Sequence, residues 1–404
     1  MKIDLNEYII LRTPVVAAPV HDSFRPRTKG GGIPVPTVGK VGLRFDSAQL
    51  SRKEIRDLPK DPSVNAVAPI MPMKLHEPVK KEGVSQADEE NVTWGVKAVG
   101  TDQSPYAGRG VKVAVLDTGI DAGHSAFSGV EILQKDFTGE CDGDENGHGT
   151  HVAGTIFGQN VDGVRIGVAP GIEQALVGKV LDAQGGGSTK SIAMAIEWAI
   201  NQGANVISMS LGMDFPGLVK ALIESGLPPE PATSQALESY RANVRLFDTI
   251  ADSTQGKGDF FQATIILAAT GNESRRDEPP NYEIAAAPPS AAEGISAIGA
   301  LGQELGGLVV APFSNTKPDF SAPGVDVISA RSGGGLVKLS GTSMATPHAA
   351  GVAALWAEKL NRSMGSLSAK ALSANLIASA TLDLLKKGFD PIDVGMGIVQ
   401  APRS

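Results

Sequence analysis

The most informative stretch of this chain runs Val111-Lys112-Val113-Ala114-Val115-Leu116 directly into Asp117-Thr118-Gly119. The first six residues are mostly apolar and β-branched, which is typical of a strand buried on both faces. The turn that follows places the Asp117 carboxylate at the carboxyl end of that strand. Taken alone, Asp117 is explained equally well as a residue that caps the turn and as a reactive group.

Similar apolar runs recur along the chain and alternate with helical patterns. We predict strands at 175–181, 205–209, 264–269 and 295–298, with helices at 188–201 and 234–252. In the second helix, Leu237, Tyr240, Val244 and Phe247 recur at three- and four-residue steps, which predicts that they face the core. This alternation predicts an α/β fold with a mostly parallel, doubly wound sheet. Sheets of this kind bind their ligands beyond the carboxyl ends of the strands.

Composition narrows the class of protein. The 404 residues include 36 Lys and Arg, 44 Asp and Glu and 42% hydrophobic residues, a globular composition with a net charge of −8. So acidic a chain is not expected to bind nucleic acid, and no apolar run is long enough to cross a membrane. Cys141 is the only cysteine, which excludes an internal disulfide and a thiolate zinc cage. No export signal is visible, so we expect a soluble cytoplasmic protein, with secretion not excluded.

The charge is divided unevenly along the chain. Residues 1–74 hold 12 Lys and Arg against 7 Asp and Glu, a balance of +5, so the remainder carries −13. The polar stretch 75–91 has few apolar residues and is expected to be an exposed linker. We therefore predict a small first domain at 1–74 and a large second domain at 92–404.

The first domain is expected to be a small α+β unit. Apolar runs predict strands at 8–11 and 64–70, and helical spacing predicts a helix at 50–58. The proline- and glycine-rich stretch 21–36 is expected to be a loop. A unit of this size builds only a marginal core, so we expect it to need a partner.

Two histidines lie in a glycine-rich stretch that opens a helix, Asn146-Gly147-His148-Gly149-Thr150-His151-Val152-Ala153-Gly154. Their three-residue spacing lacks the four-residue step and intervening glutamate of a metalloprotease helix, so the motif does not predict a zinc site. One imidazole is sufficient as a general base. We expect His148 to serve as that base and His151 to be a hydrogen-bonded structural residue.

Two further motifs carry an amide and a hydroxyl. Thr270-Gly271-Asn272-Glu273 follows a predicted core strand, and Leu339-Ser340-Gly341-Thr342-Ser343-Met344-Ala345-Thr346-Pro347-His348 opens an apolar helix. A proline is tolerated within a first turn, so the helix is expected to start near Thr342 and Ser343. The Ser343 N–H is then free to bind an oxyanion. Taken singly, Asn272 is also explained as a turn residue and Ser343 as an N-cap, and both of these alternatives remain open.

Together, Asp117-Thr118-Gly119, the motif around His148 and the motif around Ser343 closely resemble the signatures of the subtilisin-like serine proteases, also called subtilases or peptidase family S8. The similarity covers about residues 92–400. It implies a three-layer subtilisin-like fold and a serine endopeptidase that cleaves protein or peptide substrates. In this mechanism Ser343 attacks, His148 transfers the proton and Asp117 orients the imidazole. Asn272 and the Ser343 N–H would form the oxyanion hole.

The resemblance also implies where substrate binds. An extended peptide would add as a strand between two segments, and a pocket would hold the side chain before the cut. The implied residues are Gly185, Gly186, Gly187, Ser210, Leu211 and Gly212 for the strand, and Ala269, Thr270 and Gly271, with 285–287, for the pocket. Small apolar walls favour an apolar or aromatic side chain, whereas Glu273 at the rim favours a basic one. Both alternatives stay open.

The chain departs from the family pattern in several places. Ala126 and Val161 occupy positions where the family's common calcium site has Asp and Asn, so structural calcium is doubtful. We expect that no cofactor is required. The acidic loop 140–145 either binds a cation or is simply solvated, and we favour the second explanation. Its acidic residues disfavour a Cys141 thiolate, which excludes a cysteine protease. The region at about 213–259 is longer than in short family members and is predicted to be an inserted helical layer.

The first domain resembles the family's inhibitory propeptide. The resemblance implies that residues 1–74 dock on the acidic body as an intramolecular inhibitor and that the chain cleaves itself between Lys74 and Trp94. One alternative is a latent enzyme whose propeptide stays docked. Another is a non-catalytic binding protein built on a protease scaffold.

Overall fold

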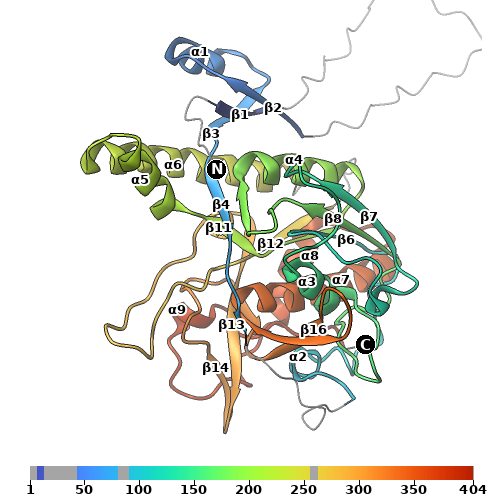
Figure 1. The fold of residues 1–404 in the computed structure, drawn as a ribbon. Helices are drawn as coiled ribbons and strands as arrows, with labels where there is room; N and C mark the ends of the chain where they lie inside the picture. Colours follow the sequence, from blue (N-terminus) through green and yellow to red (C-terminus); the bar gives the residue numbers. More distant parts are fainter. Residues whose placement is uncertain (1–6, 13–42, 81–90, 255–262, 404) are drawn as a thin grey trace, which may run out of the picture.

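The computed structural model describes residues 7–12, 43–80, 91–254 and 263–403 (Figure 1). At its centre the described strands form one sheet in the order β14-β13-β12-β10-β6-β8-β7, with β15 also paired to β13. The pairings along this sheet are parallel except for the β13–β14 hairpin. This confirms the predicted mostly parallel α/β fold. The strands are β6 (Lys112–Asp117), β7 (Glu131–Asp136), β8 (Gln174–Lys179), β10 (Val206–Met209), β12 (Ile265–Ala269), β13 (Ile295–Glu304), β14 (Gly307–Val310) and β15 (Phe320–Pro323).

Side chains along β6 alternate between two hydrophobic clusters. Val113 and Val115 belong to the cluster that contains α3 (His148–Phe157) and α7 (Thr342–Met364). Ala114 and Leu116 belong to the opposite cluster, which contains α4 (Thr189–Asn201), α5 (Phe215–Glu224) and α6 (Pro229–Thr254). Successive residues of a strand point to opposite faces, so a strand covered on both sides must be apolar throughout. The result is the three-layer arrangement that the sequence predicts.

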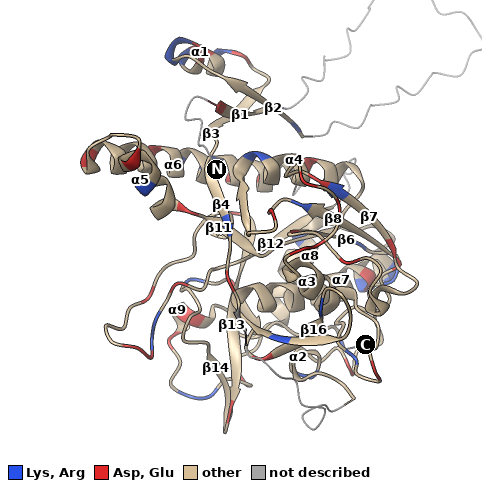
Figure 2. Ribbon diagram, viewed as in Figure 1, with Lys and Arg blue, Asp and Glu red and all other residues tan. Residues whose placement is uncertain are grey.

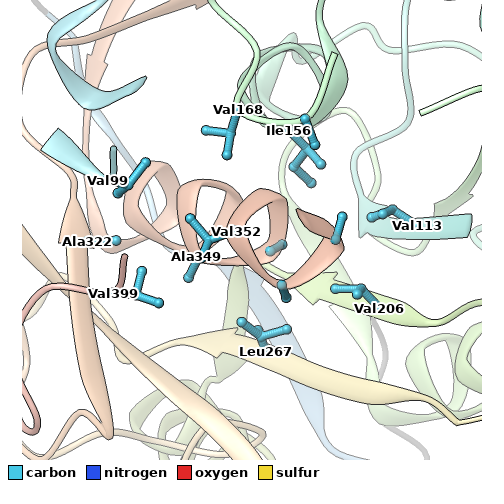
Figure 3. Packing of buried hydrophobic residues seen from close by; sticks show 14 of the residues in the cluster. Val99, Val113, Ile156, Val168, Val206, Leu267, Ala322, Ala349, Val352 and Val399 are labelled. Atoms are coloured by element: carbon cyan, nitrogen blue, oxygen red, sulfur yellow. The ribbon is translucent and has the colours of Figure 1, made fainter. Parts of the chain in front are cut away.

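Helix α7 passes through the middle of one layer and is buried along most of its length. Figure 3 shows Val352 and Ala349 enclosed by Val113, Val206 and Leu267 of the sheet and by residues of other segments, including Ile156 of α3. Many of the buried residues of α7 are small, including Ala345, Ala349 and Ala353, which lets the neighbouring elements approach closely. None of the helices in the described ranges, α7 included, has both the length and the apolarity needed to cross a membrane.

Pro347 lies in the second turn of α7, since the helix begins at Thr342 as predicted. The proline has no N–H to bond the carbonyl of Ser343 four residues earlier. That carbonyl instead accepts a hydrogen bond of 3.2 Å from the Ser210 hydroxyl. The start of the helix was therefore predicted correctly, but the reason given for it was not. Pro347 is tolerated because the Ser210 hydroxyl replaces the missing N–H donor, and not because the proline lies in the first turn.

The helix predicted at 234–252 is longer in the structure and rotated from the expected orientation. Helix α6 runs from Pro229 to Thr254, and Leu237 is 50% exposed, so the predicted core stripe is wrong at that position. Phe247 is buried as predicted, and the buried face also carries Ala232, Ala236, Ser239, Asn243 and Ile250. Small residues on this face let β3 (Val64–Pro69) pack closely, and the Asn243 amide donates to the Pro69 carbonyl at 2.8 Å.

The amino-terminal residues form a separate three-stranded antiparallel sheet in the order β2-β1-β3. Strands β1 (Glu7–Arg12) and β3 and helix α1 (Arg52–Asp57) were predicted from the sequence, whereas β2 (Arg44–Gln49) was not. The predicted loop at 21–36 lies outside the described residues. Figure 1 shows this unit above α4 and α6, and its buried residues Ile9, Leu11 and Ala68 belong to the same cluster as those helices. The small unit therefore completes its core against the larger body.

The chain after β3 does not emerge as an exposed linker. Leu75 and His76 are each only 2% exposed, which differs from the exposure predicted for the start of segment 75–91. Strand β4 (Pro72–Leu75) lies between β9 (Gly186–Ser188) and β11 (Leu211–Met213), and β5 (Val79–Lys80) pairs with β17 (Leu336–Ser340). These partners are distant in the sequence, so local composition could not show the pairing. Residues 81–90 of the predicted linker lie outside the described residues.

Glu358 anchors the far end of α7 and provides a test of its stability. Its side chain is 1% exposed, and Oε2 accepts from the backbone N–H groups of Ala107, Gly108 and Arg109 at 2.8, 2.7 and 3.1 Å. Replacing Glu358 with Ala leaves three donors without this acceptor, so we expect the free energy of unfolding to fall by about 3 kcal/mol or more. Urea denaturation of the Glu358→Ala protein, compared with the parent chain, measures this change.

The matched control is Glu224→Ala, which removes an exposed glutamate whose ion pair with Lys220 lies on the surface of α5. We expect this change to shift the free energy of unfolding by less than about 1 kcal/mol. Equal effects of the two substitutions would contradict the anchoring role of Glu358.

Candidate active site

Asp117 and His148 meet at the carboxyl edge of the sheet. Asp117 is the last residue of β6, and His148 is the first residue of α3, directly after Gly147, whose left-handed φ of 89° turns the chain into the helix. The His148 Nδ1 lies 2.7 Å from the Asp117 Oδ1, and both side chains are almost completely buried. With the carboxylate as acceptor, Nδ1 carries the proton and Nε2 is left as the basic nitrogen.

Asp144 connects these two segments and was not identified from the sequence as a site residue. It is 7% exposed, and Oδ1 accepts from the Thr118 hydroxyl and from the Gly147 N–H, both at 2.8 Å. Oδ2 accepts from the N–H and the hydroxyl of Thr150 at 2.8 and 2.6 Å. One carboxylate thus joins the residue after Asp117 to the first turn of the helix that carries His148. In the sequence, only the position of Asp144 within the acidic loop 140–145 could have suggested this role.

Asn272 and Ser343 lie together where α7 begins. The Asn272 Oδ1 accepts from the N–H and the hydroxyl of Thr342, both at 2.8 Å. These two bonds orient the amide so that Nδ2 points away from the helix, towards the backbone of residues 76 and 77. Ser343 follows in the first helical turn, where backbone N–H groups have no intrahelical acceptor.

The carbonyl of His76 occupies the space between these groups. It accepts from the Asn272 Nδ2 and from the Ser343 Oγ, each at 3.3 Å, and Nδ2 also lies 3.2 Å from the Glu77 carbonyl. The Ser343 hydroxyl also lies 3.4 Å from the Ser210 carbonyl. The His148 Nε2 is buried and has no hydrogen-bond partner among the described residues. The serine hydroxyl is therefore directed at a peptide carbonyl and not at the imidazole in this structure.

The residues expected to bind an extended peptide surround β4 of the same chain. Lys74 is paired with both Gly212 of β11 and Gly186 of β9, and Met73 is paired with Gly187. Leu75 is paired with Leu211, and its N–H donates to the Gly185 carbonyl at 2.8 Å. The structure thus brings the predicted segments together, one on each side of the extended strand β4.

Only part of the predicted pocket borders the side chain of His76. A Cβ added to Gly271 would come 3.2 Å from the His76 Cε1, and one added to Gly212 would come 2.5 Å from it. The Thr270 hydroxyl instead donates to the Ile298 carbonyl at 3.2 Å, and Ala269 is buried in β12. Glu273, expected at the rim, lies with its Oε1 3.5 Å from the His76 Nδ1.

His151 and His348 are buried neighbours of this site with structural contacts. The His151 Nε2 lies 3.1 Å from the Val327 carbonyl, and the His348 Nδ1 lies 2.8 Å from the Met344 carbonyl. Burial lowers the pKa of His151 to about 3, with a further contribution from the nearby His148, and burial lowers the pKa of His348 to about 4. Both imidazoles are therefore neutral at physiological pH.

The positions of the family's common calcium site do not fit a cation here. Ala126 and Val161 are buried in the hydrophobic core, where neither supplies an oxygen ligand. In the acidic loop, Glu140 and Glu145 contact the Lys179 ammonium at 3.0 and 2.5 Å. Among the residues that the structure describes, no group of three or more His, Cys, Asp or Glu side chains is placed to hold a metal. Cys141 in the same loop is a free, exposed thiol.

A doubly wound sheet with an aspartate, a histidine-bearing helix and a serine-bearing helix at its carboxyl edge is the architecture of a subtilisin-like serine peptidase. Residues 108–396 match the subtilase family, and the chain belongs to that family. It is 35% identical over 320 residues to the thermostable alkaline protease of Halalkalibacterium halodurans, an alignment that covers 76% of this chain and 71% of the relative. It is 32% identical over 330 residues to subtilisin E of Bacillus subtilis, covering 78% and 72% of the two chains. These similarities identify a serine-type endopeptidase.

Asp144 is expected to position the active site without touching substrate. Asp144→Ala removes the acceptor that joins Thr118 to α3, so we expect kcat for a peptide substrate to fall about 10- to 100-fold with a smaller change in KM. Steady-state kinetics with a chromogenic peptide measures both constants. The matched control, Asp142→Ala, removes an exposed carboxylate of the same loop and is expected to leave kcat unchanged. A loss of activity as large in the control would contradict a specific role for Asp144.

Buried neutral histidines predict a stability that depends on pH. Because the pKa of His151 is about 3 in the folded state and near 6.5 when unfolded, the unfolded chain binds the extra proton between these values. Stability contributed by this residue is therefore present above pH 6.5 and lost as the pH falls. We expect the unfolding midpoint of Ser343→Ala protein to drop between pH 6.5 and 5, and His151→Gln to make that drop shallower. Equal slopes in both proteins would show that His151 is not responsible.

Proposed function

We propose that this chain is a serine endopeptidase that hydrolyses protein substrates with Ser343 as nucleophile, His148 as general base and Asp117 as the residue that orients the imidazole. The observation that carries the proposal is the position of the His76 carbonyl, 3.3 Å from both the Asn272 Nδ2 and the Ser343 Oγ. A nucleophile and an oxyanion donor converge on one peptide bond, which is the geometry that acyl transfer requires.

Each chemical step has a residue placed for it. Ser343 Oγ attacks the carbonyl carbon while His148 Nε2 accepts its proton, after a side-chain rotation that brings the hydroxyl to the imidazole. Asp117 accepts the Nδ1–H bond at 2.7 Å and stabilises the imidazolium that forms. Asn272 Nδ2 and the Ser343 N–H donate to the oxyanion. The imidazolium then protonates the leaving amine, and water hydrolyses the acyl-enzyme by the same steps. Because these side chains supply nucleophile, base and oxyanion donors, we propose that catalysis requires no cofactor.

We further propose that the first domain is an intramolecular inhibitor and that the chain matures by cutting the bond between His76 and Glu77. Residues before this bond pair with β9 and β11, and residues after it pair with β17. Such pairing on both sides is what an extended substrate needs. The site lies within the range 74–94 predicted from the sequence, and the amino-terminal sheet would remain attached through its contacts with α4 and α6.

The latent enzyme remains the second candidate. Its support is the Ser343 hydroxyl, which bonds to carbonyls while the His148 Nε2 has no partner in the described part of the chain. In this alternative the segment blocks the site and is not cut until another event removes it. The two candidates differ in whether the purified chain is intact.

Intact mass measurement of the purified full-length protein tests the first candidate. We expect wild-type protein to separate into two fragments, one ending at His76 and one beginning at Glu77, because the Ser343 hydroxyl and the Asn272 amide converge on that bond. Ser343→Ala protein should stay whole. The matched control Ser366→Ala, at an exposed serine, should mature like the wild type.

Labelling with a fluorophosphonate separates the remaining alternatives. Labelling of the cleaved wild type that is lost in Ser343→Ala supports the protease. Labelling of a chain that stays intact supports the latent enzyme. An intact chain that does not label and does not cleave peptides would identify a binding protein on a protease scaffold. Cleavage that also occurs in Ser343→Ala would show that another protease makes the cut.

A further inference from the structure

Asn272 lies in a short loop that has no regular structure of its own. The residue follows β12, and residues 270–274, which we call the oxyanion loop, form neither helix nor strand. The Asn272 Oδ1 is bonded to Thr342, but those bonds fix only the amide end of the side chain. Other contacts must therefore fix the backbone from which the amide projects.

Asn315 bonds to the part of the oxyanion loop that follows Asn272. It lies 42 residues after Glu273 in the chain, and only 1% of its surface is exposed. Its Oδ1 accepts from the N–H groups of Glu273 and Ser274 at 3.1 and 3.0 Å, and from the Ser274 hydroxyl at 3.1 Å. Because a buried N–H without an acceptor is costly, these bonds hold both residues close to the Asn315 amide.

The same residue bonds to the part of the oxyanion loop that precedes Asn272. The Asn315 Nδ2 donates to the Thr270 carbonyl at 3.0 Å, and the Asn315 N–H donates to the Gly271 carbonyl at 3.1 Å. A Cβ added to Gly271 would come 2.4 Å from the Asn315 Nδ2, and Gly271 has a φ of 112°. The position therefore needs a glycine, both for its backbone conformation and for the close approach of the amide. Asn315 is thus bonded on both sides of Asn272.

The residues next to Asn315 are themselves bonded to other segments. The Ser314 Oγ accepts from the N–H of Ala300, a residue of β13, at 3.0 Å. On the other side, the Thr316 N–H donates to the Ile284 carbonyl at 2.8 Å. Asn315 therefore links the packed central sheet to the oxyanion loop.

We propose that Asn315 is a positioning residue for catalysis, which holds the Asn272 amide at the place where the oxyanion forms. It acts through Asn272 and is not itself a donor to the oxyanion. This inference rests on the proposed function, in which Asn272 is one of the two oxyanion donors. Stabilisation of the oxyanion depends on where the donor is held, so a looser oxyanion loop should slow the chemical step more than it weakens substrate binding.

Steady-state kinetics of mature Asn315→Ala protein provides the first test. The substrate is Met-Lys-Leu-His-p-nitroanilide, which copies residues 73–76, and active sites are counted by complete fluorophosphonate labelling. We expect kcat per active site to fall about 10- to 100-fold, with a change in KM of less than about threefold. The trifluoromethyl ketone of the same peptide forms a tetrahedral oxyanion, so its Ki should rise by about the factor by which kcat/KM falls.

A double-mutant cycle separates positioning of Asn272 from a general structural effect. Asn272→Ala alone should lower kcat about 100- to 1,000-fold, as expected for the loss of one oxyanion donor. In the Asn272→Ala protein, adding Asn315→Ala should lower kcat by less than about twofold, because the amide that it positions is already absent. Equal factors in the two backgrounds would show that Asn315 does not act through Asn272.

The matched control is Asn205→Ala, which removes another buried asparagine. Asn205 is 7% exposed, and its Oδ1 accepts from the Lys112 N–H at 3.0 Å. It lies at the amino-terminal ends of β6 and β10, the edge of the sheet opposite the active site. We expect this variant to unfold at a lower urea concentration and to keep the wild-type kcat and Ki. A fall in kcat as large as that of Asn315→Ala would contradict the proposed role.

Two further measurements apply if Asn315→Ala does not fold. Asn315→Asp keeps the size of the side chain and its acceptor, but it places an oxygen where Nδ2 donates to the Thr270 carbonyl and, at 2.8 Å, to the Glu273 Oε2. We expect this variant also to lose kcat with little change in KM. In the wild-type protein, the N–H groups of Glu273 and Ser274 should exchange hydrogen at least about 100-fold more slowly than that of the exposed Asp277. Exchange as fast as at Asp277 would show that the loop is not held.

The outcomes distinguish this inference from the function on which it rests. A loss of kcat in Asn272→Ala together with an unchanged kcat in Asn315→Ala or Asn315→Asp would overturn the inference and leave the proposed function intact. An unchanged kcat in Asn272→Ala would overturn both the inference and the oxyanion role of that residue. Wild-type protein that neither cleaves the peptide nor labels with fluorophosphonate would overturn the proposed function as a whole.

Discussion

Burial of helix α7 on all sides is the constraint on which the active-site geometry depends. The helix contacts the sheet, α3 and several connecting segments, and a Cβ added to Gly351 would come 2.5 Å from the Val168 Cγ1. A helix packed this closely cannot slide or rotate without opening cavities in the core. Its first turn, which carries Ser343, is therefore fixed relative to the strand ends. The Asn272 Oδ1 accepts from the Thr342 N–H and hydroxyl, so the proposed oxyanion donor is fixed to the same helix.

The sheet supplies the second fixed reference. Because β6, β10 and β12 are parallel neighbours, their carboxyl ends lie at one edge, which brings Asp117, Ser210 and Asn272 close to the beginning of α7. Buried carboxylates then join these segments where no regular structure does so. Asp144 joins the turn after β6 to α3, and Glu358 joins α7 to the chain before β6. The positions of the site residues are thus fixed because each loop that carries one is hydrogen-bonded to a packed helix or strand.

Local patterns predicted the parts of the structure that depend on local interactions. The buried strands, the start of α7 at Thr342 and the helix opening at His148 each follow from residues close together in the chain. Contacts between distant residues were not predictable in this way. The prediction that Leu237 faces the core was wrong because α6 buries its small residues against β3. Asp144 is an ordinary polar residue in the sequence, and only the fold shows that it joins the turn after β6 to α3.

The opposite net charges of the two parts of the chain do not explain how they are joined. The ion pair between the amino-terminal sheet and α4 joins Glu7 of the basic part to Lys190 of the acidic part, the reverse of what the net charges suggest. Nearby, the Phe45 N–H donates to the Glu197 carboxylate at 3.0 Å, and apolar residues of both parts share one cluster. Figure 2 shows Lys and Arg as well as Asp and Glu on both parts. In the cleft the described ion pairs have the expected sign, since Lys74 of the basic part lies 3.5 Å from Asp214 and 3.8 Å from Glu273. Strand pairing and apolar burial thus hold the unit in place, and attraction between the opposite net charges adds to them where the chain enters the cleft.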